Sequence, residues 1–295
     1  MNDALKSLIL VFAVVALLCG SAGAGEVLVL MHDPGRIERY DLESGAHRGT
    51  LLSGLPPANV VFEDIRAIDC GDDGISAHGA SRYRVDGFAS IGNATGICDT
   101  GDCETSYRNV FIDRCIGFDL YFLDTGRYSV SDAHVRSSAT QPLYLLGRAA
   151  PAGPCSVTLD NVWLERVGGE AEVRVSPGCR LTARRSTFNN LNWQATGGDV
   201  SLHQCVIGGA TSTSPPSRPR LHLWPDARWH GDGNHYGFSE IRVADRTFFA
   251  TDLAAFRQAT NSDQKSRWTL DEPPIEPGLG VDRQRLPTPL ATNGM

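Results

Sequence analysis

The middle of the chain carries short runs in which hydrophobic and polar residues alternate, and these runs recur along the sequence. Each repeat has an alternating run, a turn with Gly, Asn or Asp, and a second alternating run. The repeats begin near Val60, Tyr83, Tyr107, Tyr128, Ser156, Arg180 and Val200, at intervals of 20 to 28 residues. Alternation with a period of two predicts strands with one buried face, and no sustained 3.6-residue period indicates helices between them.

Strands in a repeat of this length, joined by turns alone, predict a solenoid whose coils stack at about 4.8 Å. One coil cannot bury its hydrophobic face, so only the stack is stable. We therefore expect an all-β solenoid of about seven coils over residues 58–250. The residues expected to point inward are Ile75, Ile97, Leu120, Leu145, Val173 and Trp193. Cys155, Cys179 and Cys205 recur about once per coil, which favours an interior column over a chemical role.

Both flanks of the repeats differ from them. Residues 25–57 predict two or three strands around a turn at Glu43–Gly45, similar to a fragment of a β-propeller blade, and we interpret them as an N-terminal β cap. Residues 251–295 predict a short helix from Asp252 to Thr260 and then a Pro-rich C-terminal tail, which we expect to be extended and loose.

The first 24 residues are typical of a cleaved signal peptide. Lys6 precedes an unbroken apolar run from Leu8 to Leu18, and small residues up to Ala24 follow. The run is too short for a membrane span, which needs about 20 apolar residues. A lipid anchor on Cys19 is the alternative. We expect no other membrane span and a secreted protein, whether extracellular, periplasmic or at the cell surface.

The charge balance of the chain indicates what it does not bind. It has 27 Lys and Arg against 34 Asp and Glu, a formal net charge of -7. Affinity for nucleic acid comes mainly from neutralising phosphates, so a nucleic-acid partner is not expected. The oligomeric state is left open by the sequence.

Seven cysteines remain after the predicted cleavage, and an exported protein can form disulfides. Cys98 and Cys103 enclose a tight loop with Gly101 at its turn, and we predict a disulfide between them. The alternative is two partly buried free thiols.

Several segments resemble a known family. The coil repeat with GDDGIS (71–76) and TGI (95–97), and the closing stretch WHGDGNHYGFSEIRVADRTFFATDLAAFRQATNSDQKS (229–266), are similar to right-handed parallel β-helix proteins of the pectate-lyase-like superfamily. The resemblance covers about residues 58–266 and implies a right-handed parallel β-helix. It does not imply one function, because this superfamily contains lyases, hydrolases, epimerases, tailspikes and proteins without known activity. The usual Gly-rich opening segment is missing.

In such a fold the substrate groove is usually an exposed sheet face. The residues expected to point outward are Ser76, His78, Cys98, Asp119, Tyr121, Tyr144, Glu172, Arg174, Asn192 and Gln194. A row that mixes aromatic, acidic and basic side chains suits a sugar-binding face, with Tyr121, Tyr144, Asn192 and Gln194 as substrate-binding residues. An ordinary solvated sheet face would also be polar.

Asp72 and Asp73 lie in a Gly-flanked turn, where carboxylates often cap the backbone. Their functional interpretation is a carboxylate pair, which could bind Ca²⁺ together with Asp99 or Asp102 or divide acid and base roles in hydrolysis. A uronic-acid lyase also needs a base, for which His78, Tyr121 or Arg174 are candidates, and Asp119 and Glu172 complete the candidate catalytic set.

His222, His230 and His235 lie close in sequence to Trp224 and Trp229. Their spacing matches no standard metal motif, so we interpret this cluster as packing in the closing coil.

Two hypotheses for function follow. One is a polysaccharide lyase or glycoside hydrolase that acts on an extracellular polysaccharide. The other is a non-catalytic β-helix that binds glycan or serves as a cell-surface structural module. Convergence of Asp72, Asp73, His78, Asp119 and Glu172 in one groove would favour the enzyme, and their separation would favour the second hypothesis.

Overall fold

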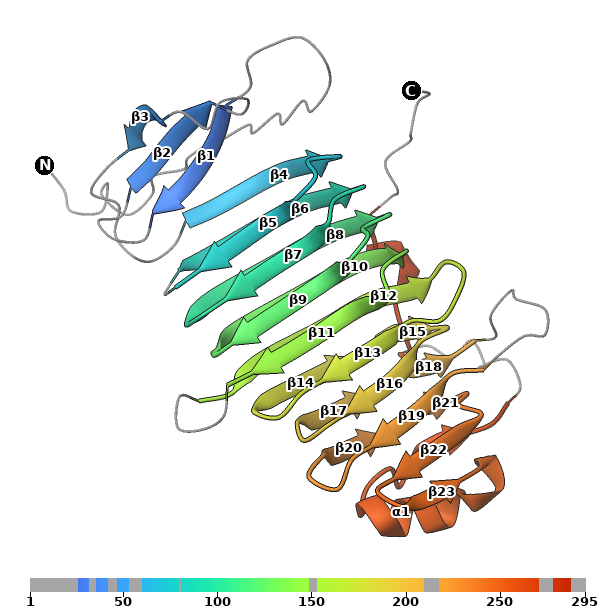
Figure 1. Cartoon of the computed structure of the whole chain (residues 1–295). Helices are drawn as coiled ribbons and strands as arrows, with labels where there is room; N and C mark the ends of the chain where they lie inside the picture. Colours follow the sequence, from blue (N-terminus) through green and yellow to red (C-terminus); the bar gives the residue numbers. More distant parts are fainter. Residues whose placement is uncertain are drawn as a thin grey trace, which may run out of the picture.

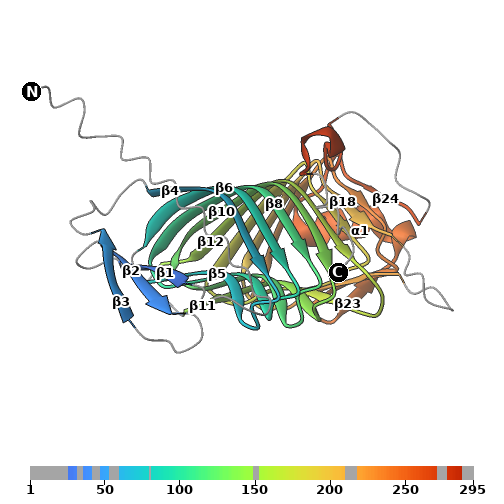
Figure 2. The same cartoon turned by 90° about the horizontal axis from the view of Figure 1, so that it is seen from above.

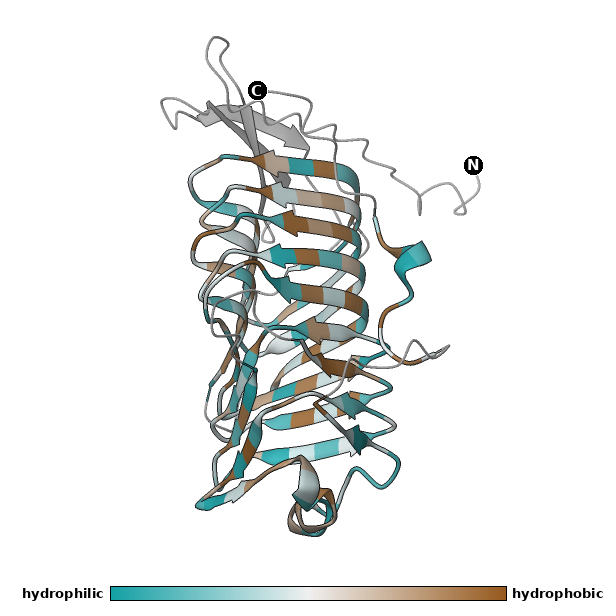
Figure 3. Cartoon of the chain, turned by 90° about the vertical axis from the view of Figure 1, so that its right-hand side faces the viewer, coloured by the Kyte–Doolittle hydropathy of each residue, from teal (hydrophilic) through white to brown (hydrophobic). Residues whose placement is uncertain are grey.

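The computed structural model describes residues 26–31, 36–41, 47–52, 60–79, 81–148, 153–209, 218–270 and 278–287. Its main body is a parallel β-solenoid of about 7 turns, with the strands of successive coils stacked in register (Figure 1). Hydrophobic and hydrophilic segments alternate along the stacked strands (Figure 3). The predicted all-β solenoid is therefore confirmed.

One face of the solenoid is a nine-stranded sheet. Its parallel strands, in spatial order, are β5 (Asp73–His78), β7 (Thr95–Thr100), β9 (Phe118–Asp124), β11 (Gln141–Gly147), β13 (Glu172–Val175), β16 (Asn192–Ala195), β19 (Arg220–Leu223) and β22 (Glu240–Val243). The last strand, β23 (Arg246–Phe248), pairs antiparallel with β22 and ends the sheet.

The other sheet begins with long strands: β4 (Val60–Ile68), β6 (Arg82–Ile91), β8 (Cys103–Asp113), β10 (Gly126–Ser137) and β12 (Cys155–Arg166). Each is interrupted by one residue with positive φ, and these residues form a column: Asp64, Gly87, Asn109, Asp132 and Asn161. The ladder pairing skips this column, so each long strand has two arms.

Beyond β12 the two arms are separate strands. The first arm continues as β14 (Cys179–Arg184), β17 (Asp199–His203) and β20 (Arg228–Asp232), and the second as β15 (Thr187–Asn189), β18 (Val206–Gly208), β21 (His235–Tyr236) and β24 (Arg267–Trp268).

The inward-pointing residues form one continuous core. Ile97, Leu120, Leu145, Val173 and Trp193 are all buried, as predicted from the alternation, and Ile75 packs partly buried against them. Cys155, Cys179 and Cys205 are all buried, which confirms their structural interpretation. They do not form one column: Cys155 and Cys179 pair in register at the start of β12 and β14, whereas Cys205 lies between β17 and β18.

The last coil is closed by a short helical segment, η2 (Ala250–Asp252) followed by α1 (Leu253–Thr260), as the sequence predicts. Phe256 of α1 is fully buried against the rings of Tyr236, Phe248 and Trp268. The helix therefore covers hydrophobic side chains that the open end of the stack would expose.

Near the N-terminus, β1 (Glu26–Met31), β2 (Arg36–Asp41) and β3 (His47–Leu52) form a three-stranded antiparallel sheet, in agreement with the strands predicted in the cap. The predicted signal peptide (1–24), Cys19 and the turn at Glu43–Gly45 lie outside the described residues. Within the described ranges no helix is long and apolar enough to cross a membrane.

The expectation of a loose C-terminal tail is wrong for residues 278–287. This segment, with the short helix η3 (Arg283–Arg285), lies on the outer side of the sheet formed by the long strands (Figures 2 and 3). Asn161 of β12 exchanges hydrogen bonds with Asp282, and Thr187 of β15 accepts one from the amide of Val281. These polar contacts hold a segment whose Pro-rich flanks suggested no fixed position.

The predicted disulfide between Cys98 and Cys103 is also wrong, because both are free thiols. Cys98 lies in the outward-facing positions of β7, whereas Cys103 is buried at the start of β8 and donates to the carbonyls of Gly79 and Thr100. The two residues are close in sequence, but the side chain of Cys98 points outward from the coil and that of Cys103 points into the core.

Candidate functional site

The outer face of the nine-stranded sheet carries one in-register row of polar and aromatic side chains, which we call the outer row. It consists of Ser76, Cys98, Tyr121, Tyr144, Arg174, Gln194, His222 and Arg242, one from each of the eight parallel strands. Seven of the eight are half-buried, and Arg242 is exposed. The outward positions predicted for Tyr121, Tyr144, Arg174 and Gln194 are confirmed.

The middle of the outer row is a stack of rings. Phe118 and Tyr121 of β9 stack with centroids 4.3 Å apart, and Tyr121 stacks on Tyr144 of β11 at 5.3 Å with the planes 14° apart. The guanidinium of Arg174 lies 5.5 Å from the centroid of Tyr144. Phe118 and Tyr144 also lie 5.8 Å apart, so the three rings form a compact cluster of nearly parallel planes. The two tyrosines add phenol hydroxyls, which can donate and accept hydrogen bonds, to this half-buried aromatic surface.

At the C-terminal end of the outer row, the surface forms an open depression. Its lining residues are His222, Trp224, Pro225, Arg242, Ala244 and Asp245. Trp224 is 45% exposed, and its indole lies 5.7 Å from the His222 ring at an interplanar angle of 34°. Trp224 thus has indole surface available to a ligand, next to the exposed guanidinium of Arg242.

The charged groups that line this depression are the guanidinium of Arg242 and the carboxylate of Asp245, and His222 lies beside them. Partial burial lowers the pKa of His222, and the neighbouring positive charge of Arg242 lowers it further. The imidazole is therefore neutral at neutral pH and can donate and accept hydrogen bonds, while Arg242 supplies the positive charge.

Glu172 and Asn192 form a second outward pair beside the outer row, in register with each other. Partial burial raises the pKa of Glu172, and the positive charge of Arg174 opposes that rise. The side-chain oxygen of Asn192 accepts from the amide of Arg220 at 3.0 Å. Asn192 is therefore engaged in connecting two coils.

The remaining outward candidates lie at the opposite end of the sheet. Asp72 and His78 are exposed, and Asp73 is half-buried. His78 Nε2 lies 3.0 Å from the hydroxyl of Ser76. Three strands separate β5 from β13, which at about 4.8 Å per strand places these groups roughly 19 Å from Glu172. The acidic turn and Glu172 therefore cannot act on one bond.

Asp119 was expected to point outward, and this is wrong: the side chain is fully buried. The pairing of β9 with its neighbours includes Phe118 and Leu120 but skips Asp119, so strict alternation fails at this corner of the coil. Among the described residues, no hydrogen-bond donor satisfies either carboxyl oxygen. Burial raises the pKa of Asp119 to about 7, although the nearby hydroxyl of Ser137 and the positive charge of Arg166 oppose the rise.

Asp99 is likewise interior and cannot bind an ion at the surface. Its carboxylate accepts hydrogen bonds from the hydroxyls of Thr105 (2.6 Å) and Tyr107 (2.9 Å) and from the amide of Ala77 (3.0 Å). The hydroxyl of Tyr83 lies 3.3 Å away. Burial raises the pKa of Asp99 to about 6, although these hydrogen bonds oppose the rise.

The proposed Ca²⁺ ligands are therefore not brought together. Asp99 points into the core, Asp102 accepts a hydrogen bond from Thr125, and Asp72 and Asp73 lie on the preceding coil. Across the described residues, no three His, Cys, Asp or Glu side chains gather in an arrangement that could hold a metal ion.

Sequence reasoning missed the depression. The interpretation of the His and Trp cluster as packing is correct for Trp229 and His235, which are buried. It is wrong for His230, which is exposed, and for Trp224 and His222, which line the depression. The signal was present, because Leu221 and Leu223 alternate with His222 and Trp224 along the chain.

The geometry defines the class of protein as a parallel β-solenoid with a polar and aromatic row on one face. No family model matches the chain, and neither curated proteins nor solved structures include a match to it.

Proposed function

We propose that the protein is a secreted, non-catalytic module that binds an extended glycan along the outer row of the nine-stranded sheet. The observation that carries this proposal is the continuity of the row. Phenol hydroxyls, the Arg174 guanidinium and the Gln194 amide lead without a break to the depression that exposes Trp224. Extended chains of sugar rings need hydrogen-bonding groups at regular intervals together with aromatic surface for their C–H faces.

The dispersion of the candidate acids and bases favours binding over catalysis. Glycoside hydrolysis needs two carboxyl groups within about 10 Å of each other, one on each side of the bond. Glu172 is roughly 19 Å from Asp73 by the strand spacing, and Asp119 is buried, so Glu172, Asp73 and Asp119 cannot supply such a pair along the outer row. The resemblance to right-handed β-helix proteins of the pectate-lyase-like superfamily supports a carbohydrate ligand and is compatible with a member that lacks catalysis.

The test is to titrate the protein, residues 25–295, with a panel of acidic and neutral polysaccharides, with and without Ca²⁺, and to measure binding, unsaturated products and reducing ends in the same samples. We expect binding to at least one polysaccharide without product. Unsaturated product or new reducing ends would instead support the alternative of a lyase or hydrolase. If no polysaccharide binds and no product forms, a carbohydrate role is refuted.

A variant locates the binding surface. Trp224→Ala removes the exposed ring of the depression, and we expect roughly a tenfold loss of affinity, about 1.4 kcal/mol. Ile116→Ala is the matched control, since Ile116 is 74% exposed in a turn between β8 and β9 and is absent from the depression. Equal affinities of the two variants would place the glycan elsewhere.

A further inference from the structure

The C-terminal segment 278–287 lies against the second arm of the long strands, away from the outer row. Its contacts with the solenoid fall on β10, β12, β15 and the turn that precedes β18. The amide of Gly280 donates to the carbonyl of Gln204 at 2.8 Å, and the amide of Val281 donates to the hydroxyl of Thr187 at 3.1 Å. The segment thus crosses several coils and is held partly through its backbone.

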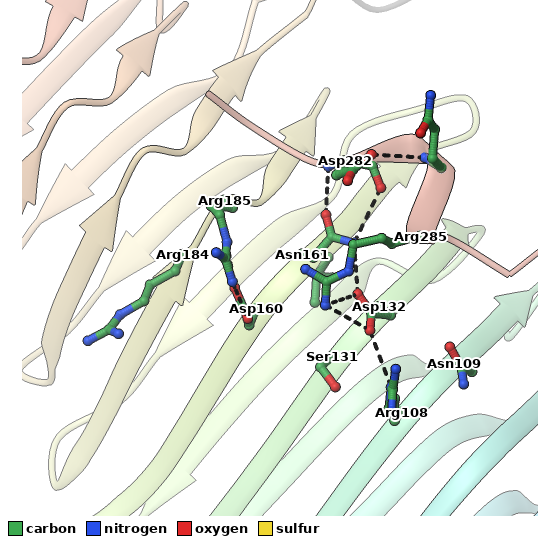
Figure 4. A network of polar contacts seen from close by, with 12 residues as sticks. Arg108, Asn109, Ser131, Asp132, Asp160, Asn161, Arg184, Arg185, Asp282 and Arg285 are labelled. Carbon is green, nitrogen blue, oxygen red and sulfur yellow. Dashed lines mark hydrogen bonds and ion pairs between the residues drawn. The ribbon is translucent and has the colours of Figure 1, made fainter. Parts of the chain in front are cut away.

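Two buried polar side chains in the positive-φ column form the centre of this surface. Asp132 is 2% exposed and Asn161 is 0% exposed. Asn161 accepts from the amide of Asp282 at 2.6 Å and donates to Asp282's carbonyl at 3.3 Å, and it also donates to Asp132 at 2.9 Å (Figure 4). The side-chain amide of Asn161 therefore forms hydrogen bonds with both the backbone N–H and the backbone C=O of Asp282.

Two arginines of the segment fill specific places on this surface. Arg285 contacts both oxygens of Asp132, at 2.8 and 3.0 Å, from the side opposite Arg108, which lies 3.4 Å from the same carboxylate (Figure 4). Arg283 places its guanidinium 4.0 Å from the centroid of the Trp163 ring. Trp163 is in turn stacked on His134 at 4.9 Å.

The surface therefore combines the buried carboxylate of Asp132, the aromatic face of Trp163 and the side-chain amide of Asn161, which binds the peptide backbone. We propose that this surface is a recognition site for a peptide whose Arg-x-Arg pattern forms a single 3-10 turn, as in η3, and that the chain's own C-terminal segment is its resident, displaceable occupant. The proposal is independent of glycan binding, because the two surfaces lie on different sheets.

Occupancy by the resident segment hides the site. A tethered segment competes at an effective concentration in the millimolar range, so a free peptide with the same contacts displaces it poorly. Removing the side chains with which the resident segment binds, while leaving the solenoid surface intact, should free the site for a peptide. Arg283→Ala/Arg285→Ala in the full chain does this, since both side chains belong to the segment and neither contributes to the core.

The experiment measures fluorescence anisotropy of a labelled synthetic peptide of residues 278–287 with the full-length double variant and with the wild-type chain. We expect saturable binding to the double variant and at least about tenfold weaker binding to wild type. A control peptide with both arginines replaced by alanine should bind the double variant about tenfold or more weakly, because each hydrogen bond to a charged group contributes substantially. Circular dichroism verifies that the double variant is folded.

A third variant tests the site itself. Adding Asp132→Asn to the double variant should reduce peptide affinity again and weaken its salt dependence, because the carboxylate partner of Arg285 is lost. A folded double variant that does not bind the peptide, or that binds both peptides equally, would overturn the proposal and leave the segment as a fixed structural clasp.

Discussion

Tyr121 and Tyr144, on adjacent coils and 23 residues apart in sequence, stack with their ring centroids 5.3 Å apart. This contact serves two purposes that substitution can separate. The ring faces stabilise the stacking of the coils, and the hydroxyls remain available at the sheet surface.

Tyr144→Phe should therefore leave the free energy of unfolding almost unchanged and reduce glycan affinity, since it removes only the hydroxyl. Tyr144→Ala should also lower stability by about 1–2 kcal/mol, because it removes the stacked ring and the platform beneath Arg174. Urea denaturation and the glycan titration measure the two effects. Loss of stability in Tyr144→Phe equal to that in Tyr144→Ala would contradict the separation.

Asp119 makes stability depend on pH. Its pKa of about 7 in the folded protein lies above the value of about 4 in an unfolded chain, so the folded state keeps a proton that the unfolded state has released. The contribution of Asp119 is fully present below about pH 4 and is lost as the pH rises through about 7.

Asp119→Asn should remove this loss. We expect the variant to gain stability relative to wild type between about pH 4 and pH 8, by a difference on the order of 4 kcal/mol at most. Asp99, whose pKa is raised to about 6, still titrates in the variant and leaves a smaller slope of the same sign. Unfolding midpoints measured across this range check the prediction, and parallel curves for the two proteins would refute it.

The hydrogen bonds to Asp99 predict a large effect in the core. Asp99→Ala leaves the donors of Thr105, Tyr107 and Ala77 without their acceptor, and we expect a loss on the order of 3–5 kcal/mol. Asp102→Ala, three residues along the chain, removes a carboxylate that accepts from Thr125 and should cost less than about 1.5 kcal/mol. Denaturant unfolding of both variants distinguishes them, and equal losses would argue against the network.

The free thiols predict a labelling pattern. Burial raises the pKa of Cys98 to about 12, so its half-buried, outward thiol should react with a maleimide more slowly than an exposed cysteine. Cys155 and Cys205 are fully buried and should react only after denaturation. Mass spectrometry of the labelled protein measures this, and a Cys98 that reacts only after reduction would restore the disulfide.

The coil repeat could be predicted from the sequence because every coil buries one face of its strands in the shared core, so every coil needs the same alternation of hydrophobic and polar residues. Leu120 and Val173 point inward and Tyr121 and Arg174 outward for that single reason. Alternation holds only where consecutive residues pair with the neighbouring coil. It fails at the corner occupied by Asp119, where the pairing skips a residue.

Other features depend on contacts between distant parts of the chain. Asp132 and Arg285 are 153 residues apart, and no local pattern marks Arg285 as its partner. The spacing around Trp224 matches no metal motif and therefore favours packing in the closing coil, although the alternation of Trp224 with the buried Leu221 and Leu223 indicates an outward position.

The C-terminal segment 278–287, which crosses several coils, also changes how the solenoid unfolds. In a linear stack each coil contacts only its neighbours, so fraying can start at either end and proceed one coil at a time. The backbone of Gly280 is bound to Gln204 in a late coil, and Arg285 is bound to Asp132 near the middle. The coils between Asp132 and Gln204 are thereby joined by a second route, so these coils should unfold as one cooperative unit, while the coils that follow Gln204 can still fray from the end.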